Sequence, residues 1–131
     1  MSPDRHRDAL GRPLPRDADP ALIVAGVPLR SELSDEDAWT EAAAYLDAGM
    51  PFHAHEVFEL RWRLAPQSDR DAWQALAQWG AALTHEARGN RLGARRVAAR
   101  ATANLDAAPH VPACIDAVLV RESCAHLSSL A

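Results

Sequence analysis

The stretch Arg70–Arg88, RDAWQALAQWGAALTHEAR, carries apolar residues in nearly every direction around a helical axis. A helix that is apolar all round is normally buried, so the pattern predicts a central helix over about residues 70–88. Ser68 or Asp69 is expected to cap its start, and Gly89 is expected to end it. The apolar positions that define this helix are Trp73, Ala75, Leu76, Ala77, Trp79, Ala81, Ala82 and Leu83.

Two amphipathic helices are predicted before the central one. Ser34 precedes three acidic residues, which is typical of an N-cap followed by an acidic first turn. Gly49 suits the left-handed turn after a helix, and Pro51 suits the first turn of the next. This second helix is expected over about residues 51–64, with Pro66 ending it.

Two further helices are predicted after the central one. Asn90 is expected to cap a helix over about residues 91–106, and a fifth helix is expected over residues 113–126. Five helices joined by short connections predict an all-α antiparallel bundle.

The N-terminal part of the chain differs in composition. Most of the nine prolines lie in residues 1–33, where helical periodicity is weak. We therefore expect an extended or partly disordered arm over 1–33 and a single helical domain over 34–131. Within the arm, Ala21–Leu29 is expected to pack across the bundle, and residues 1–19 are expected to be loosely attached.

Charge and composition exclude several classes of protein. A net charge of -4 argues against nucleic-acid binding, which normally needs a basic face. No apolar run reaches the roughly 18–20 residues of a membrane span, and the N-terminus has no apolar signal-peptide core. Cys114 and Cys124 suit neither a zinc motif nor a disulfide framework, so we expect a cytoplasmic protein with reduced thiols.

One group of side chains has the chemistry of a catalytic or metal site. His55 and Glu59 lie four residues apart on one helix face, Glu56 is next to His55, and His85 ends the central helix. If the two helices are antiparallel, His55, Glu59 and His85 can meet as ligands of zinc, manganese or iron. Glu56 is then the candidate catalytic base, or a fourth ligand, for hydrolysis of a small molecule.

The alternative interpretation is structural. Histidine and carboxylate side chains can satisfy one another inside a core and fix helix register. A shift of 40 residues also aligns Gly49 with Gly89 and Ala54 with Ala94, as in helical-hairpin repeats of the tetratricopeptide kind. On this interpretation the chain is a non-enzymatic protein-interaction module that can also form homo-oligomers. His53 is out of phase with Glu59 and is expected to face solvent.

The combination of these motifs closely resembles the domain of unknown function 309 family over about residues 38–105. The arm sequence GRPLPR at 11–16 is similar to that of longer members. The resemblance implies a small all-α fold, and members have been labelled predicted metal-dependent hydrolases, with His55, Glu56, Glu59 and His85 in the polar signature. Trp79 stands where a smaller residue is expected. The matching structural residues are Phe52, Trp62, Gly89, Asn90, Gly93 and Ala94.

Overall fold

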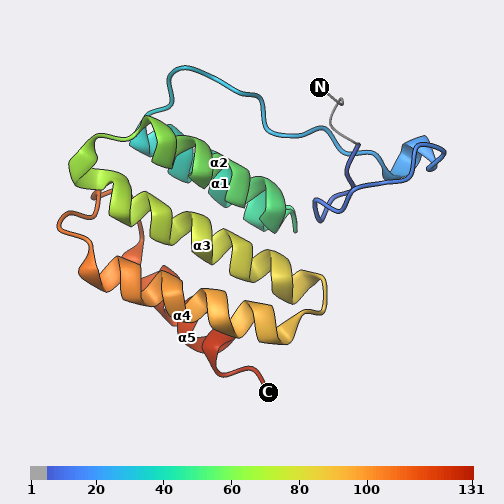
Figure 1. The fold of residues 1–131 in the computed structure, drawn as a ribbon. Coiled ribbons are helices and arrows are strands. Elements are labelled where there is room, and N and C mark those ends of the chain that lie inside the picture. Colours follow the sequence, from blue (N-terminus) through green and yellow to red (C-terminus); the bar gives the residue numbers. More distant parts are fainter. Residues whose placement is uncertain (1–5) are drawn as a thin grey trace.

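The computed structural model describes residues 6–131, and the all-α class is confirmed. Figure 1 shows α2, α3 and α4 side by side, with α3 in the middle, α1 packed on α2 and α5 packed on α4. Successive helices run in opposite directions, so the bundle is antiparallel. The helices are α1 (Asp35–Asp47), α2 (Pro51–Leu64), α3 (Arg70–Ala87), α4 (Arg91–Ala107) and α5 (Ala117–Ser128).

Local sequence signals set most of the helix ends. The Ser34 hydroxyl accepts a hydrogen bond from the Asp37 amide at 3.1 Å, as an N-cap should. The Asn90 side chain caps α4 in the same way by accepting from the Gly93 amide at 2.9 Å. Gly49 and Gly89 have φ values of 72° and 81°, the left-handed conformation that glycine adopts without strain. Helix α2 begins at Pro51 and ends at Leu64, so its predicted boundaries are confirmed.

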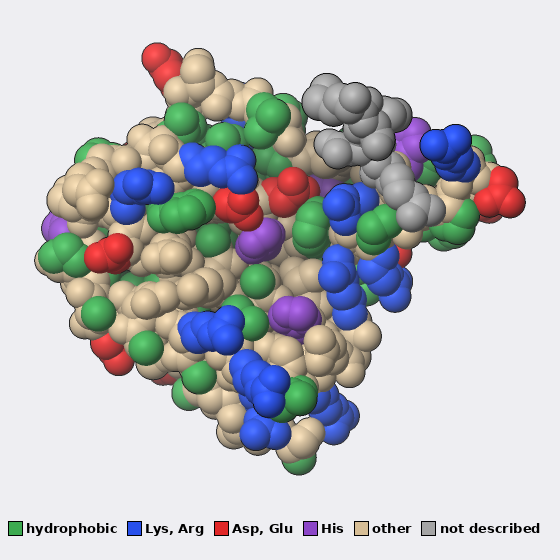
Figure 2. Space-filling view, in the orientation of Figure 1, with side chains coloured by type: hydrophobic (Ala, Val, Ile, Leu, Met, Phe, Trp, Pro, Cys, Tyr) green, Lys and Arg blue, Asp and Glu red, His purple; other side chains and the backbone are tan. Residues whose placement is uncertain are grey.

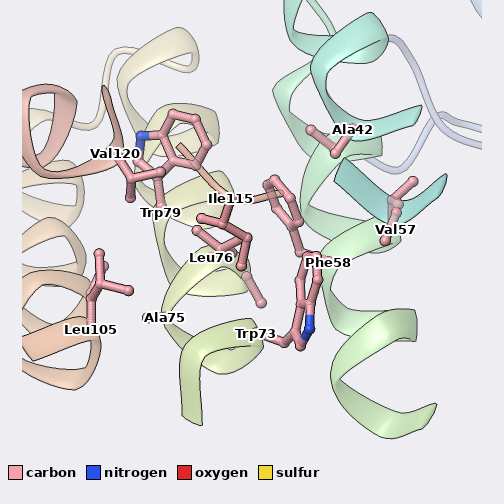
Figure 3. Packing of buried hydrophobic residues seen from close by; sticks show 14 of the residues in the cluster. Ala42, Val57, Phe58, Trp73, Ala75, Leu76, Trp79, Leu105, Ile115 and Val120 are labelled. Carbon is pink, nitrogen blue, oxygen red and sulfur yellow. The ribbon is translucent and has the colours of Figure 1, made fainter. Parts of the chain in front are cut away.

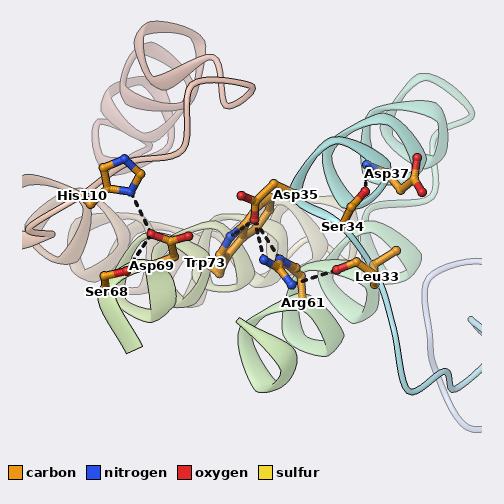
Figure 4. Close-up of polar contacts among 9 residues, drawn as sticks. All are labelled: Leu33, Ser34, Asp35, Asp37, Arg61, Ser68, Asp69, Trp73 and His110. Atoms are coloured by element: carbon orange, nitrogen blue, oxygen red, sulfur yellow. Dashed lines mark hydrogen bonds and ion pairs between the residues drawn. The ribbon is translucent and has the colours of Figure 1, made fainter. Parts of the chain in front are cut away.

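One expected helix start and one expected capping side chain are corrected. The fifth helix begins at Ala117, not at residue 113, because Asp116 caps it by accepting from the Leu119 amide at 3.1 Å. At the start of α3, neither Ser68 nor Asp69 caps the helix with its side chain. The Asp69 carboxylate instead pairs with His110 at 2.8 Å, which ties the start of α3 to the α4–α5 connection (Figure 4).

The hydrophobic core lies around α3. Phe58, Trp73 and Leu76 are fully buried, and Ile115 from the α4–α5 connection belongs to the same cluster (Figure 3). Gly80 allows α2 and α3 to approach closely, because a Cβ added there would lie 2.8 Å from the Cα of His55. The start of α2 is thereby held against the middle of α3.

A polar network joins α1, α2 and α3 (Figure 4). Arg61 donates to the Asp35 carboxylate at 2.8 Å and to the Leu33 carbonyl at 2.8 Å. The indole of Trp73 donates to the same carboxylate oxygen at 3.0 Å. Because the Arg61 side chain is only 11% exposed, these contacts are needed to satisfy its charge.

The described part of the N-terminal arm lies on the start of α2 and the end of α3. Gly11 lies directly against the ring of Phe52, and Arg88 donates to the Leu10 carbonyl at 2.6 Å. The guanidinium groups of Arg7 and Arg88 both lie over the Phe52 ring. Arg7, Leu10 and Gly11 thus connect the arm to the bundle, and residues 1–5 lie outside the described residues.

Candidate functional site

The polar side chains of α2 form a row along one face. His55 Nε2 lies 3.3 Å from the Glu59 carboxylate, and Arg63 binds the same carboxylate one turn further on. Burial lowers the pKa of His55; the Glu59 carboxylate opposes this change, and the Arg88 charge adds to it. His55 therefore favours the neutral state more than a free histidine does. Figure 2 shows acidic, basic and histidine side chains close together on the face formed by α2, α3 and α4.

Glu56 lies beside this row, under the N-terminal arm. It lines a cavity of about 160 Å³ between α2 and arm residues Val27, Pro28 and Leu29, together with His55 and Glu59. Burial raises the pKa of Glu56 most strongly, and the neighbouring Glu59 charge raises it further. His53 and Arg7 act in the opposite direction. A half-buried carboxyl group with a raised pKa can hold or accept a proton, which is the chemistry expected of a general base.

His85 does not take part in this row. Its Nδ1 lies 3.1 Å from the Asn90 side-chain amide, at the start of α4. Gly80 marks the point where α3 crosses His55, and five residues further along the helix amount to about 7.5 Å of axial distance. Between residues 6 and 131, no group of three or more His, Cys, Asp or Glu side chains is arranged to hold a metal ion. The expected set of His55, Glu59 and His85 with Glu56 is therefore not assembled.

His53 corrects the sequence interpretation. It was expected to face solvent, but it is 2% exposed, and its Nε2 lies 2.7 Å from the Ala25 carbonyl in the arm. A carbonyl only accepts, so His53 donates this hydrogen bond. The side chain packs against Tyr45, with ring centroids 5.2 Å apart. The arm covers the face of α2 that the isolated helix would expose, and this is why His53 is buried.

A second hollow lies on the other side of α3, between α1 and α5. This α1–α5 groove has a volume of about 480 Å³. Trp39, Phe58 and Trp79 form its aromatic floor, with Trp39 and Trp79 stacked at a centroid distance of 6.5 Å. The Trp79 indole donates to Ser123 of α5 at 2.8 Å. The aliphatic walls are Ala43 and Leu46 of α1, Leu83 of α3 and Leu119 of α5.

The helix packing explains why the groove is open. In Figure 1, α1 lies behind α2 and α5 lies behind α4, and side chains of both α1 and α5 line the groove. The α4–α5 connection inserts Ile115 into the core near the first half of α3, at Leu76 (Figure 3). Over the second half of α3, the groove residues Leu83, Glu86 and Ala87 have no such cover.

Some residues that shape the two sites are not predicted by hydrophobic periodicity, although the sequence contains signals for them. Gly80 is a glycine in a helix interior, which is unfavourable by about 1 kcal/mol relative to alanine and so points to a close approach of backbones. Trp39 and Trp79 suit either core and rim packing or the lining of an aromatic pocket, and the structure places both in the lining of the groove. Gly93, near the start of α4, is a second helical glycine with close neighbours. An added Cβ would lie 2.6 Å from the Asn90 side chain and 2.9 Å from His85 Nδ1.

The fold and these two sites define a small all-α protein with a polar helix face and an apolar groove. Residues 39–97 match the model of the domain of unknown function DUF309, so this part of the chain is a DUF309 domain and the resemblance is confirmed. Comparison with curated proteins and with solved structures gives no match. Within residues 6–131, no helix combines the length and apolar character needed to cross a membrane.

Proposed function

We propose that the protein is a non-enzymatic binding module whose α1–α5 groove holds the apolar face of a helix from a partner protein. The observation that carries this proposal is the groove itself, whose accessible apolar surface comes from Trp39, Leu46, Leu83 and Leu119. Its volume of about 480 Å³ lies in the range of ligand-binding clefts. Grooves between helices commonly bind amphipathic helices through apolar side chains spaced by one turn.

The size of the groove supports a helical partner. Its lining extends from Trp39 to Asp47 on α1 and from Trp79 to Ala87 on α3, about 12 Å or two helical turns on each. Two turns of a partner helix would bury side chains at positions i and i+4.

The test uses an uncharged Leu/Gln peptide of about 16 residues, which is long enough to form a helix in water. The peptide has no aromatic residue, so tryptophan emission from the protein reports its binding. We expect saturable binding. Leu119→Gln should weaken the affinity about tenfold, because it removes the free energy gained by burying one leucine side chain. Val118→Gln is the matched control, because Val118 is the neighbouring residue, is 64% exposed and does not line the groove.

The two substitutions distinguish binding in the groove from binding elsewhere. A lower peptide affinity of the Leu119→Gln variant, with an unchanged affinity of the Val118→Gln variant, supports binding in the groove. The absence of saturable binding, or equal effects of the two substitutions, contradicts it. Both positions are exposed on α5, so neither substitution is expected to unfold the protein.

A second candidate function is a divalent-metal site, with zinc or manganese, that supports hydrolysis. The contact between His55 and Glu59 favours it, because the two side chains already lie 3.3 Å apart. His85 does not fit this site as it stands, since it pairs with Asn90. The test is elemental analysis of protein purified without a tag or chelator, with thermal melts in zinc and in manganese. Bound metal, and a melting shift that His55→Ala abolishes, would support this function; no metal and no shift would exclude those two ions.

A further inference from the structure

The charged residues of the α1–α5 groove are confined to one end. Among residues 6–131, Asp47 and Glu86 are the only charged residues that line it, and both are exposed. Asp47 is the last residue of α1, and Glu86 lies in the last turn of α3. Because α1 and α3 both run antiparallel to α2, their C-terminal ends lie at the same end of the bundle. The groove therefore has an apolar body and one acidic end.

The helix ends strengthen this negative character. Unpaired carbonyl groups give the C-terminal end of a helix a partial negative charge, which favours cations and disfavours carboxylates. Asp47 and Glu86 thus occupy electrostatically unfavourable positions in their own helices. The last turn of α1 has no basic residue, and His85 in the last turn of α3 is bonded to Asn90.

Neither carboxylate is neutralised by a neighbour within the described part of the chain. The ion pairs among residues 6–131 use other acidic residues, and neither Asp47 nor Glu86 takes part in one. Two like charges and two negative helix ends therefore lie next to an apolar surface. A positively charged group of a partner that reaches this end of the groove would be attracted by both carboxylates.

We propose that the partner helix is basic as well as amphipathic, with leucine-like residues at i and i+4 in the groove and an arginine or lysine about one turn further on, between Asp47 and Glu86. This inference rests on the proposed function and adds the charge of the partner to it. The spacing follows from the lining of α1, where Trp39, Ala43 and Asp47 succeed one another at single turns. Complementary charge of this kind sets partner choice and the rate of association.

The test compares three peptides with the same leucine positions. One carries two arginines at the end expected to reach Asp47 and Glu86, one carries two glutamines there, and one carries two glutamates. We expect the arginine peptide to bind about tenfold more tightly than the glutamine peptide, and the glutamate peptide to bind more weakly than either. The preference should decrease as the salt concentration rises, because both carboxylates are exposed.

Matched variants locate the effect. The double variant Asp47→Asn, Glu86→Gln is expected to reduce the arginine preference, measured as the ratio of the affinities for the arginine and glutamine peptides, to less than about twofold. The control is Asp71→Asn, Asp106→Asn, which removes the same charge at the opposite end of the bundle and should leave the preference intact. Circular dichroism confirms that each variant is folded.

The results distinguish the charge inference from the proposed function. Equal binding of the arginine and glutamine peptides, or a preference that survives the Asp47→Asn, Glu86→Gln variant, would overturn the charge inference and leave groove binding in place. An equal loss of preference in the control variant would also overturn it, because net charge would then be the cause. If none of the three peptides binds, the groove function itself fails.

Discussion

The substitution Gly80→Ala tests whether packing or helix propensity controls the middle of α3. Propensity alone predicts a gain, because alanine in a helix interior is more favourable than glycine by about 1 kcal/mol. The structure predicts a loss. The added Cβ would lie 2.8 Å from the Cα and 3.0 Å from the backbone nitrogen of His55, and neither atom can rotate away.

The magnitude follows from the geometry. Carbon atoms in contact prefer separations of about 3.5–4.0 Å, so α2 and α3 would have to separate by about 0.7 Å. Overpacking of this kind costs about 1–3 kcal/mol, and the upper part of that range applies because the obstacle is backbone. After subtracting the propensity gain, we expect the free energy of unfolding to fall by about 1–2 kcal/mol.

Urea denaturation measures this change through the transition midpoint at constant slope. Ala99→Gly on the exposed face of α4 is the control, and it should lose about 1 kcal/mol through propensity alone. A Gly80→Ala variant that is about 1 kcal/mol more stable than the parent protein would refute the close approach of His55 to Gly80.

Four further predictions concern polar side chains. Asp35→Ala leaves the largely buried Arg61 side chain without its counter-ion and should cost about 3 kcal/mol in urea denaturation; a loss below about 1 kcal/mol would show that the pair is dispensable. Asn90→Ala should cost about 1 kcal/mol and Asn90→Ser much less, because serine also caps; equal losses would contradict the capping role. Burial lowers the pKa of His55 below its usual 6.5, so stability should fall as the pH falls through the range below 6.5, and His55→Gln should remove this fall. Burial raises the pKa of Glu56 above its usual 4.5, so the stability that the protonated carboxyl contributes is lost as the pH rises above 4.5. Glu56→Gln should therefore raise the free energy of unfolding more at pH 7 than at pH 4. The opposite trend in either pH series would refute the assigned burial.

The two sites differ in how far the sequence could predict them. The α2 row was accessible, because side chains four residues apart on a helix must be neighbours, and His55 and Glu59 are in contact. The position of His85 could not be predicted from the sequence, because it depends on where α2 crosses α3. Gly80 sets that crossing point. The groove was also inaccessible, since its lining comes from four helices and no single helix carries its pattern.

By itself, the sequence determined the helical class, the boundaries of α2 and the caps at Ser34 and Asn90. These features depend on interactions within a few residues, such as a capping side chain, a proline or a left-handed glycine. Only the tertiary structure decided that His53 is buried under the arm and that an apolar groove lies open beside α3. Burial and cavity shape depend on contacts between distant segments, and a periodic pattern specifies which side of a helix is apolar without specifying what covers it.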